Sequence, residues 1–96
     1  MPHQRLWQAV DALAASAAPI QQRLYWAGQY LLPLRPDDFA LEEREKFIEL
    51  MDDLTTREPT GDEGSLRATT SSLSDDDAVG LARRIVSLDA TYRPLS

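Results

Sequence analysis

The chain lacks cysteine and has one histidine, so most side chains that bind metals or act as nucleophiles are missing. Without cysteine, disulfides, thiolate metal sites and cysteine nucleophiles are excluded. The histidine, His3, lies near the N-terminus, where chains usually fray, which disfavours a Ser-His-Asp triad or a histidine-based metal site. Glycine-rich phosphate loops and dinucleotide-binding fingerprints are also absent. The sequence therefore predicts a protein that is not an enzyme and binds no cofactor and no metal.

Long apolar runs are missing as well. No stretch approaches the ~20 apolar residues of a transmembrane helix, and the first residues lack the apolar core of a signal peptide. We therefore expect a cytoplasmic protein that does not interact with membranes. Nine of the ten basic residues are arginines, which is typical of a bacterial protein encoded by a GC-rich genome.

Acidic residues outnumber basic residues by sixteen to ten, and the formal net charge is −6. The excess is concentrated in residues 36–63, where eleven acidic and three basic side chains give a charge of −8. Negative charge repels phosphate, so nucleic acid is disfavoured as a partner. The same charge favours a protein partner with a basic surface.

Apolar residues recur with helical spacing along the whole chain, and the alternation that marks a β-strand is absent. Proline and glycine separate the apolar segments. Helices are expected over residues 4–17, 19–32, 40–55, about 61 or 65 to 72, and 75–91. The fold class is all-α, a compact bundle of four main helices plus one short helix, with antiparallel neighbours because the connections are short. Residues 1–96 are expected to form a single helical domain with frayed ends at about 1–3 and 93–96.

The segment 40–55 has the clearest pattern. Its expected apolar face consists of Leu41, Phe47, Ile48, Leu50, Met51 and Leu54. Its opposite face carries the acidic residues Glu42, Glu45, Glu49, Asp52 and Asp53. Carboxylates at helical spacing project from one rod, whereas a catalytic or metal-binding pair usually joins two elements across a cleft. We interpret this acidic face as solvated or as the binding surface for a basic partner.

The segment 19–32 is apolar on nearly every side and carries three aromatic residues, Tyr25, Trp26 and Tyr30. Aromatic residues at helical spacing are commonly core residues. One helix of a small bundle rarely buries all of its sides, however, and Trp and Tyr are enriched in protein interfaces. Part of this set, together with Trp7, is therefore a candidate contact with another chain, including a second copy in a homodimer.

Two charged residues project among apolar neighbours, Arg44 in the third segment and Asp89 in the last. A buried carboxylate without a partner costs several kcal/mol, so Asp89 is expected to pair with Arg93, another arginine, or a Tyr or Trp donor. Arg44 either extends its head group to solvent or pairs with a buried acid. We expect one of the two to form an ion pair between helices.

These features favour a non-enzymatic protein–protein interaction or accessory module of the immunity, inhibitor or adaptor kind. An alternative is a nucleic-acid-binding transcriptional regulator with a degenerate helix-turn-helix, because short helices joined by tight turns also suit that motif. Against it, the last helix begins with three aspartates, the wrong charge for a recognition helix. An enzyme that uses carboxylates or a bound metal is the third reading.

Overall fold

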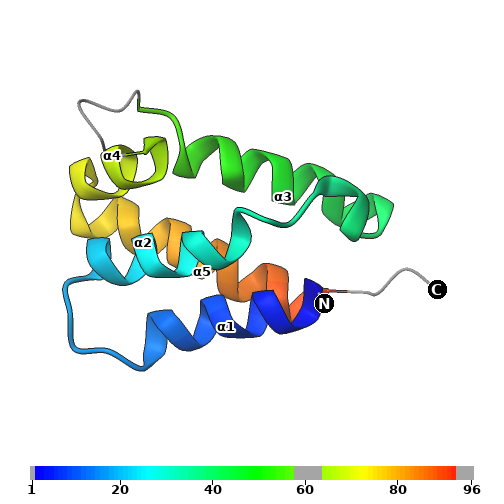
Figure 1. Ribbon diagram of the computed structural model, residues 1–96, viewed down its shortest axis with the longest axis horizontal. Coiled ribbons are helices and arrows are strands. Elements are labelled where there is room, and N and C mark those ends of the chain that lie inside the picture. Colours follow the sequence, from blue (N-terminus) through cyan, green and yellow to red (C-terminus); the bar gives the residue numbers. More distant parts are fainter. Residues whose placement is uncertain (1, 58–63, 93–96) are drawn as a thin grey trace.

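The computed structural model describes residues 2–57 and 64–92. Within these residues the chain forms five α-helices and one short 3₁₀ helix and contains no β-strand. The elements are α1 (Pro2–Ala14), α2 (Ile20–Leu31), η1 (Pro36–Asp38), α3 (Leu41–Leu54), α4 (Ser65–Ser72) and α5 (Asp75–Thr91) (Figure 1). The predicted all-α fold is confirmed.

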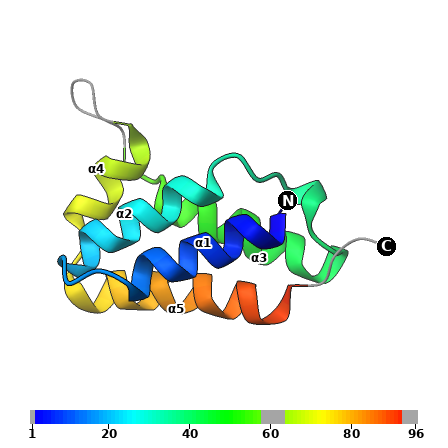
Figure 2. The ribbon, with the colours of Figure 1, turned by 60° about the horizontal axis from the view of Figure 1, so that its bottom comes forward.

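Helix α5 packs against α1, α2 and α3. Helix α2 also packs against α1 and α4. Figures 1 and 2 show that α1 runs antiparallel to both α2 and α5, so the start of α1 lies beside the end of α5. The largest fully buried side chains are five leucines, Phe39, Ile85 and two threonines of α4, Thr69 and Thr70.

The first helix begins and ends earlier than predicted, at Pro2 and Ala14 instead of residues 4 and 17. Arg23 of α2 is the physical reason for the early end. Its Nη1 donates to the carbonyl oxygen of Leu13 at 2.9 Å, and its Nε donates to that of Ala18 at 2.8 Å. A continued helix would use the Leu13 carbonyl to accept from the backbone N–H four residues later, so the arginine replaces that bond.

An aromatic cluster joins η1, α3 and α5. Phe39 is fully buried, stacks on Phe47 with ring centroids 4.5 Å apart, and meets the edge of Tyr92 at 5.6 Å. His3 stacks on the same Tyr92 ring at 5.8 Å. Burial, and secondly the negative charge of Asp38, raises the pKa of the Tyr92 phenol. The cluster closes the end of the bundle where α1 begins.

The last helix has the predicted bounds, 75–91, and the short helix before it spans 65–72, which is the later of the two starts that the sequence left open. Ser74 is the N-cap of α5, as its position before three aspartates predicts, and its hydroxyl accepts from the backbone N–H of Asp77 at 3.1 Å. Helix α4 approaches α2 closely at Gly28. A Cβ built on this glycine would lie 2.7 Å from Cδ1 of Leu66, so no larger residue fits there without movement.

Candidate interaction surface

Helix α3 turns a narrow stripe toward the core. Its buried residues are Glu43, Phe47, Leu50 and Leu54. Glu43 is the unexpected member, because its carboxylate accepts from the hydroxyl of Thr91 on α5 at 3.1 Å. Lys46 lies 3.8 Å from the same carboxylate and is itself mostly exposed. A buried acid with two partners therefore occupies a place on α3 that an apolar residue would otherwise fill.

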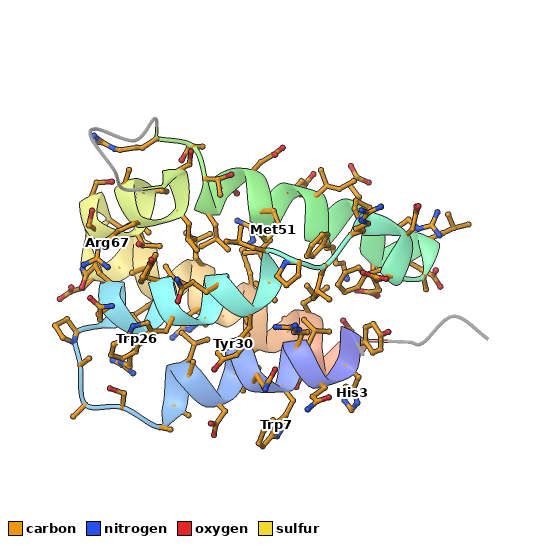
Figure 3. All side chains as sticks on the ribbon, in the orientation of Figure 1. His3, Trp7, Trp26, Tyr30, Met51 and Arg67 are labelled. Atoms are coloured by element: carbon orange, nitrogen blue, oxygen red, sulfur yellow. The ribbon has the colours of Figure 1, made fainter. Side chains whose placement is uncertain are left out.

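The predicted apolar face of α3 is wrong in two of its six residues. Leu41 is 76% exposed and Ile48 is 44% exposed. Met51 is half-buried against the core (Figure 3), whereas Phe47, Leu50 and Leu54 are buried as predicted. The physical reason is that α5, α4 and η1 cover α3 from one side. An apolar face half a helix circumference wide is too broad to be covered from one side.

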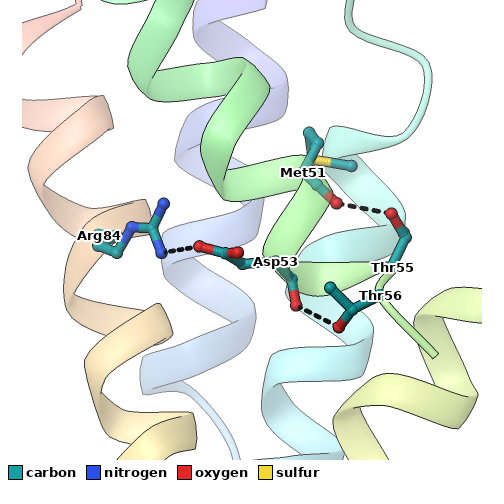
Figure 4. Close-up of polar contacts among 5 residues, drawn as sticks. All are labelled: Met51, Asp53, Thr55, Thr56 and Arg84. Atoms are coloured by element: carbon teal, nitrogen blue, oxygen red, sulfur yellow. Dashed lines mark hydrogen bonds and ion pairs between the residues drawn. The ribbon is translucent and has the colours of Figure 1, made fainter.

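All five residues of the predicted acidic face are exposed: Glu42, Glu45, Glu49, Asp52 and Asp53. Asp53 pairs with Arg84 of α5, whose Nη1 lies 2.6 Å from Oδ2 (Figure 4). The two side chains are 39% and 52% exposed, so this pair contributes at most about 1 kcal/mol to stability. Within residues 2–57 and 64–92 the other four carboxylates form no ion pair.

The exposed apolar and acidic residues of α3 together form what we call the acid-flanked ridge, defined by Leu41, Ile48, Glu45 and Asp52. The two apolar residues are seven positions apart, and each is followed four positions later by one of the acids. Residues four and seven apart share a helix face, so the carboxylates border the apolar side chains. The ridge lies on the side of α3 away from its buried stripe.

The aromatic residues of α2 are divided between two sides of that helix. Tyr25 faces α4, where the Arg67 guanidinium lies 4.9 Å from the centre of the tyrosine ring. Gln29, one turn further along α2, donates to the Tyr25 hydroxyl at 3.0 Å. Trp26 and Tyr30 lie on the side toward α1 (Figure 3). Trp26 is exposed, whereas Tyr25 and Tyr30 pack partly against the core. Trp7 of α1 is also exposed and points away from α2 (Figure 3).

Arg44 and Asp89, the two candidates for an ion pair, form none with any residue that the structure describes. Arg44 is half-buried, and its Nε donates to the carbonyl oxygen of Phe39 at 3.0 Å, which ties the start of α3 to the end of η1. Asp89 is half-buried, and its Oδ1 is buried without a hydrogen-bond partner among the described residues. Arg93, the partner named for it, lies outside the described residues, so that pairing stays a prediction.

The ridge was not predicted from the sequence, because the helical pattern placed Leu41 and Ile48 on the apolar face expected in the core. A signal for the ridge exists on the helical wheel, where both residues lie nearer to Glu45 and Asp52 than to Leu50. Residues at the border between an apolar and an acidic stripe are the first to be exposed when the covering surface is narrow.

Residues 2–57 and 64–92 contain neither a metal-binding cluster nor a membrane-spanning helix. No three His, Cys, Asp or Glu side chains there lie close enough together to hold a metal ion. Of the helices in this part of the chain, none combines the length and the apolar character needed to cross a bilayer. In comparisons with protein-family models, curated proteins and solved structures, no match to this chain was found.

Proposed function

We propose that the chain is a non-enzymatic protein-binding module whose acid-flanked ridge on α3 binds a basic, apolar-faced segment of a partner protein. The observation that carries the proposal is the exposure of Leu41 and Ile48, at 76% and 44%, between exposed carboxylates. Protein interfaces combine an apolar centre with a polar rim, and the ridge has both parts on one helix.

The charge of the ridge selects the chemistry of the partner. Glu45 and Asp52 border the apolar residues, and the acidic excess of the whole chain is concentrated in residues 36–63. Carboxylates at the rim attract a basic surface and repel an acidic one, so they set the rate of association and the choice of partner more than the affinity. An amphipathic helix with arginines or lysines beside its apolar stripe fits this surface.

Two further surfaces are weaker candidates. Trp26 lies on the α1 side of α2, away from α3, so a partner that covers the ridge does not need to reach it. The nucleic-acid alternative would use α5 as a recognition helix. Its first turn carries three exposed aspartates, and Arg84 is engaged with Asp53, which leaves this helix poorly suited to phosphate.

The test uses a fluorescently labelled synthetic helix with leucines seven positions apart and flanking arginines, titrated with the whole chain and followed by anisotropy. Glu45→Lys should weaken binding by about tenfold because it places a positive charge against the probe. Asp11→Lys, on the exposed surface of α1, makes the same change in net charge and is the matched control. Ile48→Ser should also weaken binding by roughly tenfold through loss of apolar contact.

Two outcomes would contradict the proposal. The first is equal weakening by Glu45→Lys and Asp11→Lys, which would mean that the probe responds only to net charge. The second is unchanged affinity in Ile48→Ser, since the apolar centre of the ridge would then make no contact. Circular dichroism of each variant verifies that the helices are intact.

A further inference from the structure

A second exposed apolar surface lies where α1 ends and α2 begins, against the middle of α5. It is a groove of about 270 Å³, lined by Leu13, Ile20, Arg23, Val79, Ala82, Arg83 and Val86. Val79 is 36% exposed and Val86 is 45% exposed, so two β-branched side chains of α5 remain open to water. Apolar surface left open in a groove is typical of a binding site for another helix.

The lining of the groove contains two arginines and no acidic residue, in contrast to the ridge. Arg83 is exposed at its border. The guanidinium of Arg23 donates to the carbonyl oxygens of Leu13 and Ala18, which are neutral acceptors, so its charge stays unneutralised. Neither arginine forms an ion pair with a carboxylate within residues 2–57 and 64–92. An occupant with an apolar stripe and flanking acids would therefore match the groove in both polarity and sign of charge.

The acid-flanked ridge has these properties. Leu41 and Ile48 are seven positions apart on α3, and Val79 and Val86 are seven positions apart on α5, so each pair spans about 10.5 Å along its helix. Glu45 follows Leu41 by four positions, and Arg83 follows Val79 by four positions. Two helices with equal spacing can interdigitate their apolar side chains and bring the acid beside the arginine.

We infer that the ridge of one copy docks into the groove of a second copy. The inference rests on the proposed function and specifies its partner as this same chain. One molecule cannot fill its own groove, because the ridge faces away from the core on α3 and the groove lies between α1, α2 and α5. Ridge and groove are different surfaces, so each added copy leaves one of each available, and the assembly extends as a chain or closes as a ring.

The first measurement is the mass of the whole chain by light scattering over a wide range of concentration. The average mass of the wild-type chain should rise with concentration beyond that of a dimer. Ile48→Glu removes the ridge and Val86→Glu removes the groove, and each should raise the concentration needed for association by at least about tenfold. Leu32→Glu is the matched control, since Leu32 is exposed at the end of α2 and belongs to neither surface.

The decisive measurement mixes the two variants. Ile48→Glu keeps an intact groove and Val86→Glu keeps an intact ridge, so the mixture should form a 1:1 complex that grows no further. The two altered surfaces both carry added acid and cannot pair with each other. A symmetric contact, which uses one surface on both copies, would not produce such a complex.

Three results would overturn the inference: a wild-type chain whose mass does not change with concentration, an Ile48→Glu or Val86→Glu variant that associates as well as the wild type, or a mixture of these two variants without a 1:1 complex. Binding of the basic synthetic helix is measured separately. If that binding persists while self-association is absent, the proposed function stands and the second copy is not the partner. If neither occurs, both proposals fail.

Discussion

Among the residues that the structure describes, two glycines lie inside helices, Gly28 in α2 and Gly80 in α5, and replacing each with alanine gives a matched pair of variants. At Gly80 an added Cβ meets no atom within 4 Å, so Gly80→Ala gains helix propensity without steric cost. That gain is about 1 kcal/mol. For a chain of 96 residues it corresponds to an increase in Tm of about 4–8 °C.

At Gly28 the same gain is opposed by Leu66. The added Cβ would lie 2.7 Å from Cδ1 and 3.0 Å from Cδ2 of that leucine, well inside contact distance. Leu66 is 5% exposed, so the shift of its methyl groups that the added Cβ requires takes place among buried neighbours. Overpacking of this kind costs about 1–3 kcal/mol. Gly28→Ala should therefore lower the free energy of unfolding by up to about 2 kcal/mol, in contrast to Gly80→Ala.

The assay is urea denaturation followed by circular dichroism, with the free energies extrapolated to water. A second background separates steric from intrinsic effects. In a chain that already carries Leu66→Ala the two clashing methyl groups are gone, so Gly28→Ala should become stabilising, as Gly80→Ala is. Equal stabilisation by both alanines in the wild-type background would refute the close approach of α2 to α4.

Ser74→Ala should lower the free energy of unfolding by about 1 kcal/mol, because the backbone N–H of Asp77 loses its acceptor, while the exposed Ser71→Ala should have little effect in the same urea assay. Burial, and then the charge of Asp38, raises the pKa of the Tyr92 phenol above its ordinary value of 10.0, so the folded chain holds this proton more tightly than the unfolded chain does. That contribution to stability is complete below the ordinary value and is lost as the pH rises above it. Tyr92→Phe should therefore show a weaker loss of stability at alkaline pH, and identical alkaline profiles would contradict this reading.

Local signals in the sequence were sufficient for the fold class and for most helix bounds. Ser74 before three aspartates marked the start of α5, and proline at position 19 marked the entry to α2 within one residue. The acidic stripe from Glu42 to Asp53 is exposed as expected, because charged residues at helical spacing stay in water regardless of which neighbours cover the opposite side.

Features that depend on contacts between helices were not predictable from periodicity. The end of α1 is set by Arg23, a residue of the next helix. The exposure of Leu41 and Ile48 depends on how much of α3 the other helices cover, and the groove beside Val86 depends on where α1 and α2 meet α5. Periodicity describes one helix at a time and carries no information on how closely the helices approach one another.

The hydrogen bond between Glu43 and Thr91 has a consequence for the outer surface of α3. Apolar contacts alone would let α3 rotate about its own axis. The hydrogen bond from the Thr91 hydroxyl to the Glu43 carboxylate fixes that rotation. The orientation of the outer face of α3 is thus set by a contact inside the bundle. Replacing Glu43 and Thr91 with aliphatic residues would remove this hydrogen bond. Substitutions at these two positions would then alter partner binding at the acid-flanked ridge without changing any residue of the ridge.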